Sequence, residues 1–222
     1  QYLKYYPVFH AVLAWTLGPA DASMFLRSTW GNLAGNLWWG AIHLLGYVLV
    51  PVIVIRVVLR QRLRDYGLGW SATHRYAGWY LALAAPIVFF AFLVSYTPAF
   101  QHTYPFYRFA GRSWADLLAW EVIYLAQFAF LEFFFRGFLL HAMARAFGAV
   151  AIFIMAVPYL MIHFTKPWPE AFGALAFGIL LGILSLRSGS IWGGASVHMT
   201  VALSMDLMAL AQENQWPGQL WP

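Results

Sequence analysis

The sequence predicts an all-α membrane protein, a polytopic bundle of about six transmembrane helices. Of its 222 residues, 62% are hydrophobic and only 9% are charged, whereas a soluble domain carries about 25% charged residues. A single soluble core cannot bury so much apolar side chain, so lipid must surround the chain. The 12 Trp, 12 Tyr and 19 Phe residues fit aromatic belts at both interfaces. No stretch alternates cleanly between apolar and polar residues, as a strand would.

Six apolar runs reach or approach the roughly 20 residues that a helix needs to cross a bilayer. They cover residues 33–57, 76–96, 114 to past 140, 148–164, 170–186 and 190–211. The apolar run at 7–18 is too short to span, so we expect residues 1–32 to form an interfacial or re-entrant segment. The membrane-embedded domain then covers residues 33–212, and 213–222 form a C-terminal tail.

Start and stop signals separate these runs. Ser113 and Asp116 resemble a capping box at the head of the third helix. Gly148 breaks the third helix from the fourth, and the turn at 187–190 divides the fifth from the sixth. Glu170 follows two prolines at the start of the fifth helix, where a carboxylate stabilises the positive end of the dipole.

The distribution of arginine predicts the orientation. A dense cluster follows the first helix at Arg56, Arg60, Arg62 and Arg64, and Arg75, Arg145 and Arg187 fall on the same side of a six-helix topology. The positive-inside rule places this side in the cytoplasm. We therefore expect a protein of the bacterial cytoplasmic (inner) membrane, with the Arg56–Arg64 loop in the cytoplasm. The net charge of +5 is spread too thinly to indicate nucleic acid.

Four ionisable residues lie inside the apolar runs: Glu132, His163, His198 and Asp206. Such residues are costly at membrane depth and usually mark a functional site. Glu132 and His163 each lie about 15 residues from the turn at Gly148, so both are expected about 23 Å from it, at equal depth.

The last two helices carry small residues at helical spacing. On the sixth, the spacing puts His198 and Asp206 on one face with alanines at 195, 202 and 209. The fifth has a stripe of Ala171, Ala174, Gly178, Gly182 and Ser185. Small faces let membrane helices pack closely, so we expect a tight bundle with its acids and imidazoles facing inward. Glu121 shares a face with Glu132 three turns away.

A carboxylate and an imidazole at one depth can activate water. The carboxylate takes a proton, the imidazole holds the water, and a second histidine stabilises the oxyanion on a peptide carbonyl. Glu132 with His163 is the candidate pair, and His198 is the candidate oxyanion donor or second water ligand. Arg136, one turn after Glu132, would orient the carboxylate.

Three segments come in the order of the motifs of the CPBP family, which comprises CAAX prenyl proteases and bacteriocin-processing (Abi-type) membrane proteins. They are Leu131-Glu-Phe-Phe-Phe-Arg136, Tyr159-Leu-Met-Ile-His163 and His198-Met-Thr-Val-Ala202. The family motifs are Glu-Glu-x-x-x-Arg, Phe-x-x-x-His and His-x-x-x-Asn/Asp. The resemblance covers roughly residues 60–210 and implies a glutamic-type intramembrane endopeptidase that works without a metal.

The chain departs from the family pattern at three positions. Leu131 replaces the first Glu, which the family resemblance assigns as the water-activating base. Tyr159 replaces Phe, and Ala202 replaces the final Asn or Asp, for which Asp206 one turn on could substitute. The catalytic set that we predict is Glu132, His163, His198 and Arg136, with Asp206, Glu170, Tyr159 and Glu121 in support.

Other interpretations stay open. Glu132 and Arg136 form a favourable i, i+4 pair that could be purely structural, and His163 could bond a backbone carbonyl. A non-catalytic immunity, assembly or accessory subunit of a membrane complex is the main alternative, and a proton relay is a third.

The predicted partners are membrane lipid and a membrane-anchored protein or peptide substrate. Two histidines and a carboxylate could hold zinc. The sequence has no His-Glu-x-x-His helix and no cysteine, and we predict neither metal nor cofactor.

Overall fold

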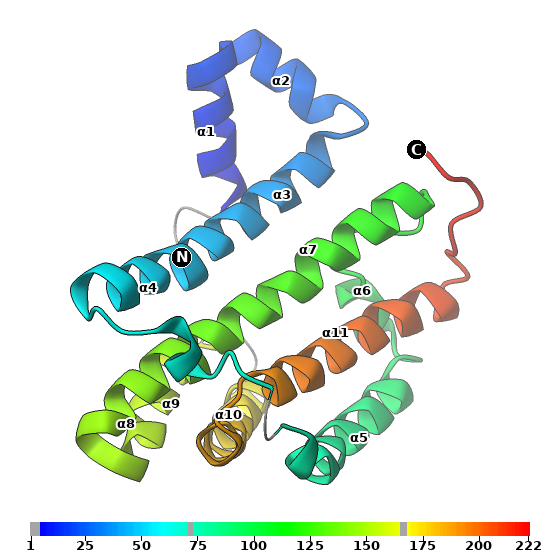
Figure 1. Cartoon of the computed structure of the whole chain (residues 1–222). Coiled ribbons are helices and arrows are strands. Elements are labelled where there is room, and N and C mark those ends of the chain that lie inside the picture. Colours follow the sequence, from blue (N-terminus) through cyan, green and yellow to red (C-terminus); the bar gives the residue numbers. More distant parts are fainter. Residues whose placement is uncertain (1–4, 71–72, 165–167) are drawn as a thin grey trace. The chain divides into compact units, whose positions relative to one another are not determined.

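The computed structural model (Figure 1) describes residues 5–70, 73–164 and 168–222, with only the backbone for 168–170. These residues form helices and one isolated antiparallel bridge, Leu68–Ser190, but no strand. The all-α class is therefore confirmed. The chain divides into two compact units, each discontinuous in sequence: unit 1 comprises 1–45, 85–127 and 200–222, and unit 2 comprises 46–84 and 128–199. The predicted division into 1–32, 33–212 and 213–222 stays a prediction.

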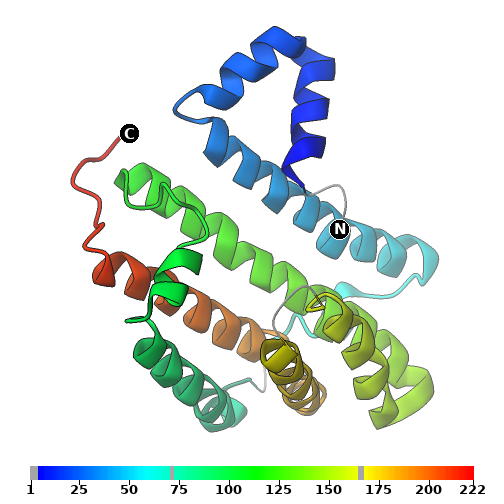
Figure 2. The ribbon, with the colours of Figure 1, turned by 180° about the vertical axis from the view of Figure 1, so that it is seen from behind.

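Unit 1 begins with three helices that follow one another around a three-sided arrangement, visible from both sides in Figures 1 and 2. They are α1 (Tyr6–Leu17), α2 (Pro19–Arg27) and α3 (Gly31–Leu44). Both α1 and α2 pack against α3. Gly31 is required at the start of α3, because a Cβ there would lie 2.3 Å from the Leu26 carbonyl oxygen. The apolar run at 7–18 thus corresponds to α1, and its interfacial or re-entrant placement stays a prediction.

The rest of unit 1 comes from helices that also contribute residues to unit 2. It holds the C-terminal part of α5 (Ala77–Val94), the short α6 (Pro98–Thr103), most of α7 (Trp114–Glu132) and the end of α11 (Trp192–Gln212). The C-terminal tail is ordered against the start of α7. The amides of Trp114 and Ala115 donate to the carbonyls of Gln219 and Leu220. These bonds satisfy two of the donors that a helix start leaves unpaired.

Side chains cap the start of α7 as well. The amide of Asp116 donates to Ser113 Oγ at 3.1 Å, and the Ser113 hydroxyl donates to Asp116 Oδ2 at 2.7 Å. The Arg112 guanidinium and the Tyr107 hydroxyl both donate to Asp116 Oδ1 at 2.7 Å. These hydrogen bonds raise the pKa of Arg112. The predicted cap at Ser113 is confirmed, in a larger network than the sequence indicated.

Unit 2 contains three π-helical segments, whose turns are wider than those of an α-helix. The first two, η2 (Leu45–Leu49) and η3 (Val54–Val58), lie on either side of α4 (Val50–Ile53), and Leu45 itself belongs to unit 1. The third, η6 (Phe133–Leu140), lies between α7 and α8 (His141–Phe147). Short 3₁₀ turns, η4 (Leu63–Tyr66), η5 (Thr73–Tyr76) and η7 (Gly148–Val150), join the longer helices. The wide turns of π-helical segments are frequently found at functional sites.

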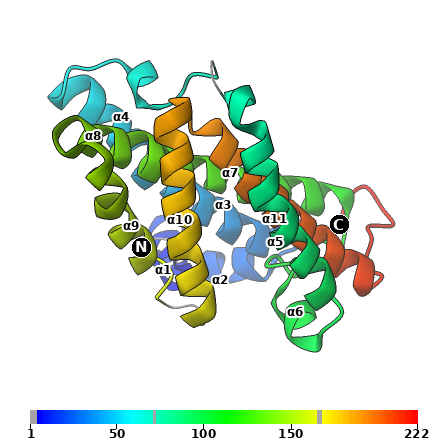
Figure 3. The same ribbon diagram turned by 90° about the horizontal axis from the view of Figure 1, so that it is seen from below.

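The apolar core of unit 2 lies where η6 packs against α9 (Ala151–Met161) and α10 (Trp168–Ser188). Figure 3 shows α9 and α10 side by side. One cluster joins Leu131 and Phe135 to Ile152, Met155 and Tyr159. The chain turns between α8 and α9 at Gly148, whose φ of +54° suits glycine. The break predicted at this position is confirmed.

Among the described residues, five helical runs are long and apolar enough to cross a membrane. They are Gly31–Val58, Thr73–Val94, Trp114–Met161, Ala171–Ser188 and Trp192–Gln212. The run Trp114–Met161 contains the third and fourth of the six helices expected from the sequence. Its last part, α9, has 11 residues and is about 17 Å long, which is too short to span alone.

Candidate functional site

Unit 2 places a fully buried ion pair at the junction of α7 and η6. Glu132 is the last residue of α7, Arg136 lies in η6, and Arg136 Nη1 is 2.9 Å from Glu132 Oε1. Their side chains are 1% and 0% exposed. The i, i+4 pair expected from the sequence is therefore present. Because a buried charge is stable only with a partner, Arg136 holds Glu132 as a carboxylate.

The second partner of Glu132 comes from α11. His198 Nδ1 lies 2.9 Å from the same Oε1 atom. Gly194, one turn before His198, makes room for the acid, since a Cβ there would be 2.6 Å from Glu132 Oε2. The rings of Phe128 and Phe177 flank the imidazole at 5.7 and 5.8 Å. The side chain of His198 is 15% exposed, so this imidazole connects the buried pair to the surroundings.

Tyr159 on α9 links the two histidines. Its hydroxyl is 3.5 Å from His198 Nε2, and its backbone carbonyl accepts from His163 Nδ1 at 2.9 Å. The Arg136 guanidinium lies over the Tyr159 ring, 4.0 Å from the centroid. Gly178 on α10 permits this packing, because a Cβ there would be 2.7 Å from the Tyr159 ring and 3.4 Å from Arg136 Nη2. The small stripe predicted on this helix thus has a function in packing.

The structure pairs Glu132 with His198, whereas the sequence predicted the pair Glu132–His163. The carbonyl that His163 bonds is available because α9 ends at Met161, and not because of Pro158 within the helix. The catalytic pairing of Glu132 with His163 stays a prediction.

Several buried polar atoms of Glu132, Arg136 and His198, the Glu132 cluster, lack a hydrogen-bond partner among the described residues. The contacts at 2.9 Å are close enough for ion pairs, but their angles do not meet hydrogen-bond geometry. Both carboxylate oxygens of Glu132, the three guanidinium nitrogens of Arg136 and His198 Nδ1 therefore have no well-aligned partner among the described residues. Buried polar atoms in this state are rare and usually bind water or a ligand. This arrangement suits a site where water reacts.

Two of the supporting residues lie in unit 1. Asp206 is fully buried, and its Oδ2 accepts from the indole of Trp120 at 2.7 Å. Glu121 is 8% exposed, and neither of its oxygens has a hydrogen-bond partner among the described residues. Their roles, including the substitution of Asp206 for Ala202, stay predictions. The side chain of Glu170 lies outside the described part of the chain.

The described residues bring together no group of three or more His, Cys, Asp or Glu side chains that could hold a metal ion. Within the cluster, the Arg136 guanidinium occupies the position beside Glu132 where a cation would bind.

Residues 112–204 match the family "Type II CAAX prenyl endopeptidase Rce1-like". This Rce1-like segment contains Glu132, Arg136, Tyr159, His163 and His198, so the resemblance expected from the sequence motifs is confirmed over it. No curated protein and no solved structure matches the chain. With the five apolar runs, the Rce1-like match supports an integral membrane protein of a CAAX-protease kind that acts on membrane-associated peptides.

The sequence did not indicate the residues that make room for the contact between Glu132 and His198. Gly194 precedes His198 in an ordinary helical run, and Phe128 and Phe177 are two of many aromatic residues. The four-residue spacing between Gly194 and His198, which puts them on one face, was the available signal.

Proposed function

We propose that the protein is an intramembrane endopeptidase in which Glu132 and His198 activate water to hydrolyse a peptide bond of a membrane-anchored substrate. The main support is the buried contact between Glu132 Oε1 and His198 Nδ1 at 2.9 Å. The carboxylate beside Nδ1 favours the tautomer with the proton on that nitrogen, which leaves the lone pair of Nε2 to accept a proton from water. Arg136 keeps Glu132 ionised, so Glu132 orients and stabilises the imidazolium as it forms.

The remaining residues have roles that follow from their positions. Water loses a proton to His198 Nε2 and adds to the peptide carbonyl, and the imidazolium then gives the proton to the leaving amine. The Tyr159 hydroxyl, 3.5 Å from Nε2, can donate to the oxyanion. His163 fixes the end of α9 by donating Nδ1–H to the Tyr159 carbonyl, which leaves its Nε2 as a candidate acceptor for the attacking water. The low dielectric strengthens each interaction.

The test is cleavage of a prenylated peptide with a quenched fluorophore across its C-terminal residues, by the full chain in lipid vesicles. Loss of a general base or of its orienting partner lowers rates by roughly 10²–10⁴-fold, so we expect Glu132→Gln and His198→Gln each to fall in this range. Glu213→Gln and His74→Gln, which lie outside the cluster, are matched controls. Unchanged cleavage by both Glu132→Gln and His198→Gln would reject the assignment.

One observation favours a non-catalytic accessory subunit as a second candidate. Leu131, which replaces the first motif Glu, is 9% exposed and packs with Phe135, Ile152 and Met155. The position that carries the base in the family pattern is thus part of the apolar core. An accessory subunit would show no cleavage, and Glu132→Gln would leave assembly of its membrane complex unchanged.

A further inference from the structure

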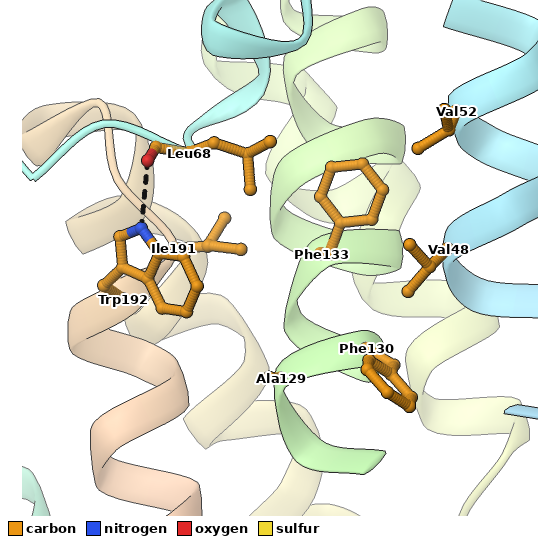
Figure 4. Close-up of a pocket in the computed structure, with 8 residues that line it drawn as sticks. All are labelled: Val48, Val52, Leu68, Ala129, Phe130, Phe133, Ile191 and Trp192. Atoms are coloured by element: carbon orange, nitrogen blue, oxygen red, sulfur yellow. Dashed lines mark hydrogen bonds between the residues drawn. The ribbon is translucent and has the colours of Figure 1, made fainter. Parts of the chain in front are cut away.

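A cavity of about 190 Å³ opens in unit 2 on the side of α7 next to Glu132. Figure 4 shows its walls: Val48 and Val52 on one helix, Ala129, Phe130 and Phe133 on another, and Leu68, Ile191 and Trp192. The loop wall is held in place by Ile191, whose amide donates to Gly67 O at 2.9 Å. This cavity has no role in the proposed hydrolysis.

The walls of the cavity are apolar. Its one side-chain donor, Trp192 Nε1, already donates to Leu68 O at 3.0 Å. Apolar cavities do not retain water, and most of the lining residues belong to candidate membrane spans. The volume is below the roughly 300–1,000 Å³ of most small-molecule pockets. A slender hydrocarbon chain is therefore the ligand that fits.

The chain between two cavity residues, Val52 and Leu68, is strongly basic. It carries four exposed arginines, Arg56, Arg60, Arg62 and Arg64. One carboxylate, Asp65, accompanies them, 3.9 Å from Arg64.

Tyr66 ties this loop to the protein. Its buried hydroxyl donates to Gln61, and Arg145 from α8 lies over its ring at 5.0 Å. Arg145 is thus a fifth arginine in contact with this loop.

Aromatic residues indicate the depth of the cavity mouth. The rings of Trp70 and Trp192 stack with centroids 5.0 Å apart, and Trp70 is 62% exposed. Exposed tryptophans and arginines are typical of the level of the lipid headgroups, and Trp70 follows Arg62 and Arg64 in the same loop. The cavity therefore begins at the depth where acyl chains meet their headgroups.

We propose that unit 2 binds one anionic phospholipid, with part of an acyl chain in the cavity and its phosphate on the Arg56–Arg64 cluster. The charge of the cluster selects the headgroup, because basic residues at the surface attract anionic lipids. The cavity holds the chain by burying its methylene groups.

The test uses the full chain in neutral detergent with phosphatidylglycerol or phosphatidylcholine of identical acyl chains, and counts bound lipid by native mass spectrometry. Each arginine near an anionic surface is worth about fivefold in binding. We expect Arg60→Gln with Arg62→Gln to weaken phosphatidylglycerol binding by roughly 25-fold. The control pair Arg27→Gln with Arg187→Gln removes the same charge elsewhere and should retain the lipid.

A matched apolar pair tests the cavity. Val52→Phe fills it, whereas Val57→Phe makes the same change at a position that is 66% exposed. We expect the first variant to lose the lipid and the second to keep it; if Val52→Phe does not fold, the arginine variants alone decide. Equal binding of both lipids, or retention of phosphatidylglycerol by the Arg60/Arg62 variant, would overturn the proposal. So would displacement of the lipid by a neutral prenylated peptide, which would make the cavity a substrate site.

Discussion

At the scale of single residues, Glu132 has two basic partners and lies beside a leucine where the family pattern has an acid. Both partners contact the same oxygen, Oε1. A carboxylate held in this way is a poor proton acceptor, which is why we assign the proton transfer to His198. The neighbouring Leu131 completes an apolar core, and in the proposed mechanism a histidine takes the role that the family pattern gives to an acid.

Removing Arg136 should destabilise the protein strongly. Breaking a buried pair by deleting one partner costs about 3–5 kcal/mol, because the other charge stays buried. We expect Arg136→Met to lower the melting temperature of the detergent-purified chain clearly. The double variant Glu132→Leu with Arg136→Met should recover much of the loss, since no charge remains. Equal melting of the Arg136→Met variant and the wild type would contradict a stabilising pair.

The sequence predicts candidate residues that the structure places in one unit, but it does not predict their contacts. Glu132, Arg136, Tyr159, His163 and His198 all lie in unit 2. The prediction that Glu132 and His163 lie at equal depth counted 1.5 Å per residue, which holds only for an α-helix. The chain after Glu132 is π-helical for eight residues, so such a count does not apply there.

At the scale of elements, glycines decide how closely helices approach around the site. Gly178 lies under the Tyr159 ring, while Gly173, on the same helix, has nothing within 4 Å of an added Cβ. The sequence predicts the small stripe but not which of its members is in contact, because that depends on the rotation of each helix. The π-helical segments likewise have the composition of ordinary apolar helix.

Gly178→Ala should weaken the site by pushing Tyr159 and Arg136 apart. Overpacking of this kind costs about 1–3 kcal/mol, and we expect a lower melting temperature together with slower peptide cleavage. Gly173→Ala is the matched control and should gain up to about 1 kcal/mol from better helix propensity. If both variants melt alike, the close approach at Gly178 has no energetic weight.

The loss of one hydroxyl, that of Tyr107, should weaken the cap of α7. Tyr107 is 2% exposed and donates to Asp116, and hydrogen bonds to charged groups contribute about 1.5–3 kcal/mol. Tyr107→Phe should cost an amount in this range, whereas Tyr96→Phe, at a residue that is 58% exposed, should be neutral.

The stabilisation that Tyr107 contributes should depend on pH. Burial raises the pKa of Tyr107 above its ordinary value of 10.0. The stabilisation is therefore complete below about pH 10 and is lost above it, as the unfolded phenol ionises first. The melting difference between wild type and Tyr107→Phe should shrink above about pH 10; a constant difference would contradict this.

At the scale of the whole molecule, composition and the apolar runs of the sequence predicted an all-α membrane protein and the approximate bounds of its membrane spans. The expected runs at 33–57, 76–96, 170–186 and 190–211 correspond closely to four of the five candidate spans. The fifth candidate span, Trp114–Met161, differs from the prediction because it joins the third and fourth expected helices, between which the chain turns at Gly148. The two compact units mix distant parts of the chain, which no local pattern could indicate.

The absence of cysteine from the sequence makes the topology easy to test. We expect Arg62→Cys and Arg187→Cys to react with a membrane-impermeant maleimide only from the cytoplasmic side. His102→Cys, in the short helix α6, should react only from the opposite side. Labelling of Arg62→Cys and His102→Cys from the same side would refute the predicted orientation.

The uneven exposure of the Glu132 cluster has a practical consequence for chemical probes. A carboxyl-activating reagent has no route to a side chain that is 1% exposed, while the imidazole of His198 is 15% exposed. In a variant whose exposed His10, His74 and His102 are replaced by Gln, acylation of the cluster by a small electrophile such as diethyl pyrocarbonate would therefore begin at this ring and would block its proton-accepting nitrogen. The rate of that modification is a direct gauge of whether a bound peptide occludes the entrance.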